Sequence, residues 1–359
     1  KTCTGQIKIM KALGLISRPK VGGTHSKFKW VEINRPTLKK DQISLVVKAT
    51  ALNVDDIHIA EGTAFGGIPM GLPKPKANKP LILGMDVCGI VDAVGDGVEK
   101  LRIGDPVFGV VYPWNRVGGM APFCCANAKQ FYPLPKLWSF EEGAAMGVAA
   151  ATACATLKIL GEVTNKRCVV IGASGSIGSL LIQALSKYGV KEVIGVCSES
   201  NTSHVTSLGA DRAIDYNQGP WGDQLTENTK GVDFIIDCIG GKDTEIEALK
   251  LLKKDGHFVT LCGPVRFFGD QKTPFLSLLR IYTYLTKRIL FSRLKGPKYT
   301  LTYGTLPDWK MIQKDLIDNN IKPTIDSTFN YTEHDIESAF KKLQSHRNRG
   351  KIVIKARKN

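Results

Sequence analysis

Residues 168–178 read Cys-Val-Val-Ile-Gly-Ala-Ser-Gly-Ser-Ile-Gly, an apolar run that passes into a turn of small residues. The stretch that follows, 179–188, has the apolar spacing of a helix. In a strand–turn–helix of this kind, Gly172 lets the chain leave the strand, Gly175 leaves room for a pyrophosphate against bare backbone, and Gly178 lets helix and strand pack closely. The phosphates would lie over amide groups at a helix N-terminus, where the helix dipole favours negative charge. The motif therefore predicts the start of a dinucleotide-binding unit.

The sequence around this motif supports the prediction, although Ala173 stands where the strict G-x-G-x-x-G form has glycine. Strand-like runs follow at 192–197, 213–216 and 232–237. Strands that alternate with helical stretches indicate an α/β fold with a doubly wound parallel sheet and a ligand at its carboxyl edge. The residues expected to line this edge, besides the three glycines, are Ser174, Ser176 and Ile177 in the turn and Cys238 and Cys262 after two later strands.

The first 135 residues are different in character, with short apolar runs and regularly spaced turns that indicate a β-rich region. A strand is expected at 43–51, and a loop rich in Gly, Pro and Lys at 62–80. At 359 residues the chain is long enough for two domains with cores of their own.

The formal net charge of +16 is concentrated in two segments. Residues 1–40 contain ten Lys and Arg and one acid, and residues 272–307 contain seven Lys and Arg and no acid. Such patches can bind an acidic membrane, RNA or a protein partner, but they also occur on basic organelle proteins without a dedicated ligand, which is the interpretation we favour. No zinc-finger, RNA-recognition or helix-turn-helix signature accompanies the charge, so sequence-specific binding of nucleic acid is not expected.

The cysteines indicate the compartment. There are nine, scattered and without a Cys-x-x-Cys pair. An odd number without disulfide spacing predicts a reducing environment: the mitochondrial matrix, another reducing organelle or the cytosol. The chain begins with Lys and no secretory segment follows, so we expect that a leader was removed or that the sequence begins late. No uninterrupted apolar run reaches the about 18–20 residues of a membrane span.

The segment 275–291 mixes Leu, Ile, Phe and Tyr with basic side chains. A helix of this composition can lie on a membrane, which would give peripheral membrane contact through 272–307. More often the apolar residues of such a helix face the protein's own core, and we favour that interpretation.

Several short motifs occur in order along most of the chain: Asn53 after a strand, Gly84-Met85-Asp86-Val87-Cys88-Gly89, Gly104-Asp105-Pro106-Val107, the turn 172–178, Gly209-Ala210-Asp211, Asp237-Cys238-Ile239-Gly240-Gly241 and Arg349-Gly350-Lys351. Together they make the sequence similar to medium-chain dehydrogenase/reductases of the zinc-free quinone oxidoreductase branch. Within this branch, Tyr112-Pro113-Trp114 and the stretch 349–354 look most like the mitochondrial reticulon-interacting oxidoreductases.

The resemblance implies two domains. Residues 1–143, completed by 309–359, would form a GroES-like β-rich domain, and residues 144–308 would form an inserted Rossmann domain. Members of this family hold nicotinamide and substrate between the two domains, and they commonly pair through the last strand of the nucleotide sheet, here 298–304. We therefore expect a small electrophilic substrate and a homodimer.

Zinc-dependent members of the superfamily place a Cys ligand where this sequence has Asn53 and a His ligand where it has Met85. Neither an amide nor a thioether is a usual zinc ligand, and the four closely spaced cysteines of a structural zinc lobe are absent from the sequence. No metal is therefore expected. Without a zinc Lewis acid, the chemistry that remains is hydride delivery to a quinone or to an alkene conjugated to a carbonyl.

The candidate catalytic residues are Asn53 and His58. Asn53 is expected to bind the acceptor carbonyl or the nicotinamide ribose. His58 occupies the position where many quinone reductases carry a Tyr that touches substrate; it can donate a proton near neutral pH, or it can be a histidine satisfied by the core or surface. The resemblance also places Thr152 beside the nicotinamide, although a helical Thr can equally bond to its own backbone.

The choice of cofactor depends on the end of the second strand of the nucleotide unit. An NAD enzyme has Asp or Glu there to bind the ribose hydroxyls, whereas this chain has Ser198. In NADPH-dependent relatives a Ser here and a Tyr matching Tyr216 surround the 2′-phosphate, and an Arg like Arg349 reaches the cofactor. Glu199 would oppose a phosphate if it turned inward. NADPH is the cofactor we predict.

Two classes of function remain open. The first is an NADPH-dependent reductase of quinones or α,β-unsaturated carbonyls, with an enoyl-thioester reductase of the same fold as its alternative. The second is a non-catalytic component of an assembly, whose basic patches bind membrane, RNA or protein. An intact phosphate turn favours the enzyme, because a purely structural relative has no need of it.

Overall fold

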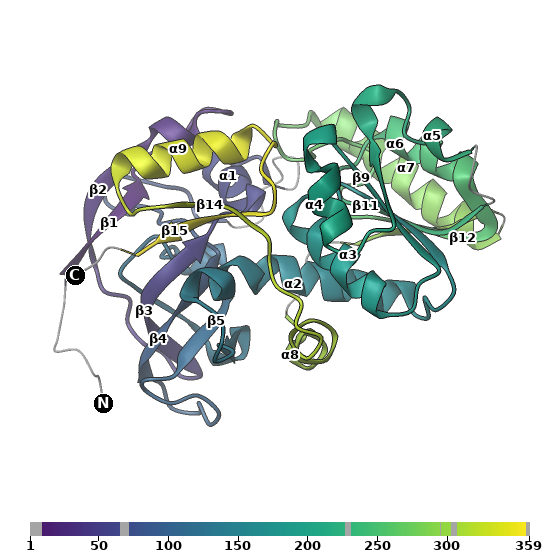
Figure 1. Cartoon of the computed structure of the whole chain (residues 1–359). Coiled ribbons are helices and arrows are strands. Elements are labelled where there is room, and N and C mark those ends of the chain that lie inside the picture. Colours follow the sequence, from purple (N-terminus) through teal and green to yellow (C-terminus); the bar gives the residue numbers. More distant parts are fainter. Residues whose placement is uncertain (1–8, 65–71, 227–230, 295, 303–306, 357–359) are drawn as a thin grey trace. The chain divides into compact units, whose positions relative to one another are not determined.

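The computed structural model describes residues 9–64, 72–226, 231–294, 296–302 and 307–356 (Figure 1). They form two compact units. Unit 1 is made of the described residues of Lys1–Val148, Gly269–Lys272 and Pro323–Asn359, and unit 2 of those of Ala149–Phe268 and Thr273–Lys322.

Unit 2 is built on a six-stranded parallel sheet with the strand order β10-β9-β8-β11-β12-β13. The strands are β8 (Arg167–Ile171), β9 (Glu192–Cys197), β10 (Arg212–Asp215), β11 (Val232–Asp237), β12 (Leu252–Thr260) and β13 (Lys298–Leu301). The order reverses between β8 and β11, and a doubly wound sheet binds its ligand at this reversal, outside the carboxyl ends of the strands. The strands predicted at 192–197 and 232–237 are confirmed.

Helices cover both faces of this sheet: α3 and α4 lie on one face and α6 and α7 on the other (Figure 1). The helices of the unit are α3 (Ser176–Lys187), α4 (Thr202–Ser207), α5 (Asp223–Thr226), α6 (Lys242–Leu251), α7 (Phe275–Leu294) and α8 (Trp309–Ile312), the last continuing into a π-helical turn, Gln313–Ile317. The core between them is aliphatic, with Val169, Ile194, Leu225 and Ile235 fully buried. The helix expected after the glycine turn is confirmed as α3.

Unit 1 is β-rich, as the sequence predicts. Strands β1 (Ile9–Leu15) and β2 (Phe28–Asn34) pair antiparallel, and a larger sheet has the order β14-β15-β3-β4-β5-β7, with β6 also paired to β3. Its strands are β3 (Gln42–Ala51), β4 (Asp86–Val94), β5 (Pro106–Val110), β6 (Phe123–Asn127), β7 (Phe131–Pro133), β14 (Ile325–Phe329) and β15 (Lys351–Lys355); its helices are α1 (Val54–Glu61) and α9 (Glu333–Gln344).

The end of the chain returns to unit 1 and completes it. Strand β15 pairs antiparallel with β3, with Val353 opposite Ala51, and the amide of Leu52 donates to the carbonyl of Ile352 at 2.9 Å. This pairing brings the first residue of β15, Lys351, beside Asn53, the residue that precedes α1.

Helix α2 (Phe140–Leu160) is the one helix of the described chain that is long and apolar enough, by composition, to cross a membrane. Most of its apolar window is buried within the protein, which is typical of a core helix. Its charged residues lie near its two ends, Glu141 and Glu142 in the first turn and Lys158 in the last.

Candidate functional site

The glycine turn of unit 2 has the backbone that the sequence predicts. Gly172 has φ +78°, a conformation that side-chain-bearing residues rarely adopt. A Cβ on Gly178 would lie 2.2 Å from the carbonyl oxygen of Gly172, so only glycine lets α3 start this close to β8. A Cβ on Gly175 would meet only the oxygen of Gly172, at 3.3 Å. The fold itself therefore requires glycine at 172 and 178, whereas the room at Gly175 suits an approaching phosphate.

Gly175 is the N-cap of α3 and supplies no side chain to cap it. The first amides of a helix have no partner within the helix, so those of Ser176 and Ile177 are available to a phosphate. Ser174, in the turn itself, accepts a hydrogen bond from Asn201 Nδ2 at 3.3 Å. The turn thus offers backbone donors and a dipole to an anion, and it fits the pyrophosphate of a dinucleotide.

The polar residues beyond the end of β9 connect to this turn. Asn201 Nδ2 also donates to Ser198 Oγ at 3.0 Å, and Ser198 Oγ lies 3.2 Å from Ser200 Oγ. Asn201 therefore links the end of β9 to the phosphate turn, a role that sequence reasoning missed because it follows from the packing of two loops. Tyr216, just past β10, is 54% exposed, and Glu199 is exposed.

A buried carboxylate organises the ends of β11 and β12. Asp237 Oδ1 accepts hydrogen bonds from the amides of Ile239 and Gly240 at 2.9 and 2.8 Å, and Oδ2 accepts from Thr260 Oγ1 at 2.8 Å. Burial raises the pKa of Asp237, and these hydrogen bonds oppose the rise. The arrangement fixes the loops that carry Cys238 and Cys262. The Sγ of Cys262 lies 3.6 Å from the carbonyl oxygen of Cys238.

The remaining two residues predicted to contact the cofactor, Thr152 and Arg349, belong to other elements of the chain. Thr152 is buried within α2, and its carbonyl accepts a hydrogen bond from Thr156 Oγ1 at 2.9 Å. Arg349 belongs to unit 1, is exposed, and its backbone amide donates to Asp326 Oδ1 at 2.8 Å.

In unit 1, Asn53 is part of a buried polar cluster with Lys351 and Asp86. Lys351 Nζ donates to Asn53 Oδ1, and it donates to Asp86 Oδ2 at 2.7 Å. The exposed fractions of Asn53, Lys351 and Asp86 are 8%, 3% and 0%. Asp86 Oδ1 accepts from the amide of Val148 at 2.7 Å, which gives both of its oxygens a partner. The cluster pairs a buried ammonium with a buried carboxylate, which limits the cost of taking either out of water.

Lys351 determines how the Asn53 amide is oriented. An ammonium can only donate, so the oxygen of Asn53 must face it and the amide nitrogen must point elsewhere. That nitrogen, Nδ2, is buried and has no hydrogen-bond partner among the residues that the structure describes. An unpaired buried donor is costly, and it marks a position where a ligand carbonyl can accept.

Asp56 supports this residue from the first turn of α1. Its Oδ2 accepts from the amide of Asn53 at 3.0 Å and its Oδ1 from the amide of Gly84 at 2.9 Å. Burial raises the pKa of Asp56 to about 7, against the effect of these two hydrogen bonds. The carboxylate joins the start of α1 to the loop before β4, so that Asn53 and Asp86 are held together by backbone as well as by Lys351.

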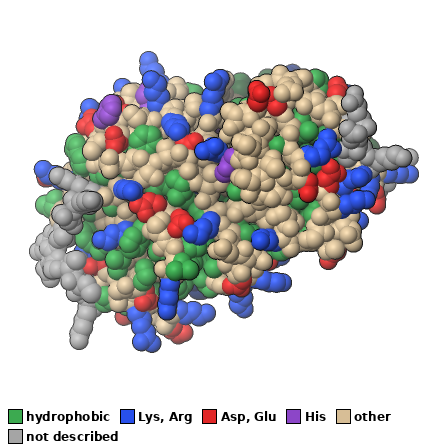
Figure 2. Space-filling view, in the orientation of Figure 1, with side chains coloured by type: hydrophobic (Ala, Val, Ile, Leu, Met, Phe, Trp, Pro, Cys, Tyr) green, Lys and Arg blue, Asp and Glu red, His purple; other side chains and the backbone are tan. Residues whose placement is uncertain are grey.

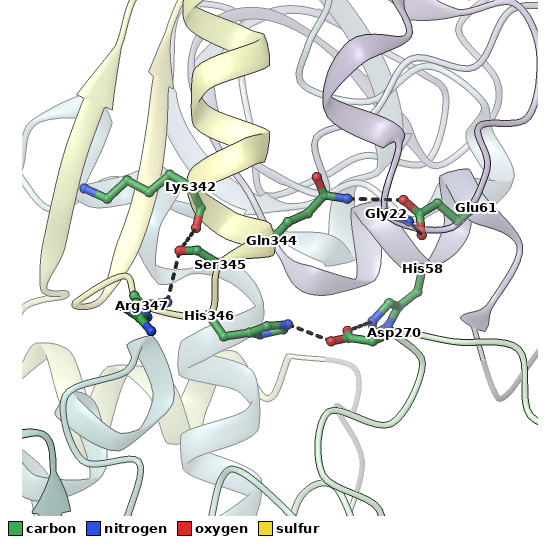
Figure 3. Close-up of polar contacts among 9 residues, drawn as sticks. All are labelled: Gly22, His58, Glu61, Asp270, Lys342, Gln344, Ser345, His346 and Arg347. Carbon is green, nitrogen blue, oxygen red and sulfur yellow. Dashed lines mark hydrogen bonds and ion pairs between the residues drawn. The ribbon is translucent and has the colours of Figure 1, made fainter. Parts of the chain in front are cut away.

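His58 is engaged in a second cluster, shown in Figure 3. Asp270 receives two histidines: His58 Nε2 lies 3.1 Å from Oδ1 and His346 Nε2 lies 2.7 Å from Oδ2. Gly269 packs on the other edge of the His58 ring, since a Cβ there would lie 2.6 Å from Nδ1. Burial raises the pKa of Asp270, but the hydrogen bonds from His346 and His58 outweigh it and hold the pKa below its usual range. His58 thus has a carboxylate partner that the sequence did not predict.

Comparison with known proteins identifies the family models and relatives that this chain matches. Residues 39–173 match the family model described as an alcohol dehydrogenase GroES-like domain, and residues 208–354 match the model described as a zinc-binding dehydrogenase. The mouse (Mus musculus) protein named NAD(P)H oxidoreductase RTN4IP1, mitochondrial, is 29% identical over 86% of this chain and 81% of its own length. The tomato (Solanum lycopersicum) 2-methylene-furan-3-one reductase is 29% identical over 89% of this chain and 73% of its own length.

Solved structures give the same fold. The quinone oxidoreductase from Coxiella burnetii superposes with a TM-score of 0.78 at 24% identity, covering 98% of this chain and 100% of the other. The CurK enoyl reductase superposes with a TM-score of 0.76 at 19% identity, covering 98% and 100%. The chain belongs to the medium-chain dehydrogenase/reductase superfamily, with a GroES-like domain and a Rossmann domain, and it is an oxidoreductase of the class that uses a nicotinamide cofactor.

The second family model is described as a zinc-binding dehydrogenase, and the side chains present in this chain decide whether zinc can bind. Met85 is buried, with a thioether that is no usual zinc ligand, and the oxygen of Asn53 already accepts from the Lys351 ammonium. A cation beside that ammonium would be repelled. Across the described ranges, which leave out six short stretches, no three His, Cys, Asp or Glu side chains are grouped so that they could hold a metal ion. These residues do not fit a catalytic zinc site.

Proposed function

We propose that this protein is an NADPH-dependent, zinc-independent reductase of quinones or α,β-unsaturated carbonyls. The observation that carries the proposal is the buried, unpaired Nδ2 of Asn53, whose oxygen is held by Lys351. NADPH, when bound, supplies the hydride. The chain's own residues then have to hold the acceptor and stabilise the charge that develops on its oxygen.

Asn53 fits this second task. Addition of a hydride to a quinone or an enone leaves negative charge on the carbonyl oxygen, and an N–H donor fixed in advance stabilises that charge more than it stabilises the neutral ketone. Lys351 lies behind the amide and polarises it through Oδ1, because the ammonium withdraws electron density from the group that donates. Removal of one preorganised donor of this kind typically costs about 100- to 1000-fold in rate.

The preference for NADPH is supported by the end of β9. Ser198 presents a hydroxyl where an NAD enzyme presents a carboxylate, and Asn201 and Ser200 surround it with further neutral groups. These neutral side chains do not repel a 2′-phosphate, whereas a carboxylate at position 198 would, and Glu199 beside them is exposed to solvent. Tyr216 is exposed and can contribute its ring and hydroxyl to the adenosine.

The cofactor is tested first by titration calorimetry with NADPH and NADH, on the natural protein and on Gly175→Asp and Gly175→Ala. We expect tight NADPH binding that Gly175→Asp abolishes, because a carboxylate in the phosphate space repels the pyrophosphate. Gly175→Ala adds bulk without charge and is the matched control. Absence of nucleotide binding by the natural protein would overturn the enzyme hypothesis and favour the non-catalytic assembly component.

The acceptor is tested by steady-state rates with a small quinone, an enone and an enoyl thioester, on the natural protein and on Asn53→Asp. Aspartate keeps an oxygen for Lys351 but removes the N–H donor, so the protein stays folded while kcat falls for every acceptor. An unchanged kcat in Asn53→Asp would remove Asn53 from the mechanism. Turnover confined to the thioester would replace the quinone and enone by the enoyl-thioester alternative.

His58 remains a candidate general acid in this proposal. Reduction of an enone adds a hydride to the β-carbon and a proton to the α-carbon, while the oxygens of a reduced quinone can take their protons from solvent. His58→Gln is therefore expected to slow enone reduction and to leave quinone reduction nearly unchanged if His58 donates that proton. Equal loss with both acceptors would make His58 a positioning residue of the Asp270 cluster.

Three further properties follow by analogy with the relatives. The names of several relatives include mitochondrial, and we propose the same compartment, which fluorescence microscopy of the tagged protein tests. Strand β13 lies at the edge of the sheet of unit 2, and we propose that two chains pair there, which sedimentation velocity tests. The substrate is a small electrophilic molecule.

A further inference from the structure

Helix α7 (Phe275–Leu294) is firmly attached to unit 2 by one of its faces. Leu278 and Leu285 are buried against the unit. Glu245 of α6, only 2% exposed, accepts hydrogen bonds from Tyr284 Oη at 2.9 Å and from Arg288 Nε at 2.7 Å. This part of the helix behaves as the sequence predicts, with apolar residues that face the protein's own core.

The opposite face of α7 is apolar as well, and there the prediction of a core-facing helix was incomplete. Large side chains on this face are exposed: Phe275 by 78%, Leu276 by 67%, Leu279 by 55%, Tyr282 by 48%, Leu290 by 54% and Phe291 by 62%. Phe275, Leu276, Leu279 and Tyr282 follow one another at spacings of one or three residues, which places them on one side of the helix. Leu290 and Phe291 lie eight and nine residues beyond Tyr282, toward the end of the helix. We call these six residues the α7 stripe.

The α7 stripe is unusual for this molecule. Fifteen large hydrophobic residues are exposed in the described part of the chain, and six of them lie in these 17 residues of one helix. Single exposed apolar side chains are normal, but several large ones on the exposed face of one helix mark a surface that another body covers. Since α7 is anchored by Glu245, Tyr284 and Arg288, the stripe is held in place on the surface of unit 2.

The charged residues of α7 and of the segment around it, 272–307, are all basic. Arg280 and Lys287 are exposed on the same helix, and the segment 272–307 contains no Asp or Glu. The carboxylate that anchors α7, that of Glu245, is buried and already engaged by Arg288. Figure 2 shows Lys and Arg scattered over the visible face of the molecule, so basic charge alone does not distinguish α7. The combination with the apolar stripe does.

We propose that the α7 stripe docks the protein on the surface of an anionic lipid membrane. Leu and Phe side chains that stand out from a fixed helix can enter the boundary between headgroups and acyl chains, and Arg280 and Lys287 then lie at the level of the lipid phosphates. A second copy of the chain fits less well. A two-fold contact through this helix would bring cations of both copies together with no acid of 272–307 to balance them.

The test is co-sedimentation of the purified full chain with two kinds of vesicle: phosphatidylcholine alone, and phosphatidylcholine with about 30% phosphatidylglycerol. We expect binding to the anionic vesicles and little to the neutral ones. Leu279→Glu with Phe291→Ser removes the apolar contact and should abolish binding. Arg280→Glu with Lys287→Glu should weaken it by at least tenfold, since each cation contributes about fivefold.

The matched control is Leu137→Glu, because Leu137 is 90% exposed, apolar and lies in unit 1. It should bind vesicles as the natural protein does. All variants change exposed side chains, and unchanged thermal unfolding midpoints establish that they are folded. Vesicle binding that is equal in the stripe variant, the charge variant and the control would overturn the proposal.

A second measurement separates the membrane from a second copy of the chain. Sedimentation velocity without lipid should give the same mass for the natural protein and for Leu279→Glu with Phe291→Ser. A loss of mass in that variant would make the stripe a contact between copies and overturn the lipid assignment. Neither measurement depends on turnover, so failure here is distinguishable from failure of the proposed reductase activity.

Discussion

The Nζ atom of Lys351 lies 2.7 Å from Asp86 Oδ2, and both side chains are almost completely excluded from solvent. The two residues are 265 positions apart in the chain, and they meet because β15 joins the sheet beside β3. Removal of one member of a buried ion pair leaves an uncompensated charge, which costs about 3–5 kcal/mol. We expect Lys351→Met to lower the free energy of unfolding, measured in urea, by that amount.

A double variant separates the two roles of Lys351. Lys351→Met with Asp86→Asn removes both charges, and the amide oxygen introduced at position 86 can still accept from the amide of Val148, so much of the lost stability should return. Activity should not return, because nothing then holds the oxygen of Asn53; kcat falls while KM changes little if the lost contact is made mainly in the transition state. Recovery of kcat in the double variant would contradict the positioning role of Lys351.

The glycines of the turn give a second prediction. Gly178→Ala places a methyl group 2.2 Å from a backbone oxygen, and we expect it to cost about 1–3 kcal/mol of folding free energy as an overpacked site. Gly175→Ala meets its nearest atom at 3.3 Å, so its effect on unfolding should stay within about 0.5 kcal/mol. The affinity of the Gly175→Ala variant for the nicotinamide cofactor should nevertheless fall. Equal destabilisation by the two variants in urea titrations would refute this assignment of the turn.

The end of β9 gives a third prediction, which concerns the choice between NADPH and NADH. Ser198→Asp creates the carboxylate that NAD enzymes use, so NADPH affinity should fall by at least about tenfold relative to NADH, since charge repulsion with the 2′-phosphate is added. Glu199→Gln removes the exposed acid next to it and should raise NADPH affinity slightly. Calorimetry with both nucleotides measures the ratio. A ratio that does not move in Ser198→Asp would mean that the 2′-phosphate binds elsewhere.

The phosphate turn could be predicted from the sequence because its signal is local. Gly172 and Gly178 are required by backbone geometry within eleven residues, and apolar spacing identifies β9, β11 and α3 by the same short-range logic. The domain limits at 143/144 and 308/309 are a longer-range inference from the resemblance and stay a prediction, as do the roles of Thr152 and Arg349.

The buried clusters could not be predicted, because their members meet only in the folded chain. The motifs that contain Asp86 and Lys351 are recognisable in the sequence, but neither residue has a local pattern that announces its partner. A Lys at the start of the apolar run Lys351–Ile354 is the one available signal, since a charged residue inside a buried strand needs an opposite charge. Helix α7 shows a different limit: periodicity identified an apolar face but could not tell that two faces were apolar and that one stayed exposed.

The cluster of Asp270 with His58 and His346 makes a prediction about acid stability. The pKa of Asp270 is lower in the folded protein than the usual value of about 4, so the unfolded state binds more protons in the acid range. The carboxylate therefore stabilises the fold above about pH 4, and that contribution is lost as the pH falls below this value and through the folded pKa. Asp270→Asn lacks the contribution at every pH. We expect the natural protein to be more stable than Asp270→Asn near neutrality and the difference to shrink toward about pH 2.

Urea unfolding of both proteins from about pH 6 to about pH 2.5 measures this difference in stability. Asp243→Asn is the matched control, because Asp243 forms an exposed ion pair with Arg266 that contributes at most about 1 kcal/mol. Parallel stability curves for the natural protein and Asp270→Asn over the whole range would show that the two histidines do not hold this carboxylate in solution.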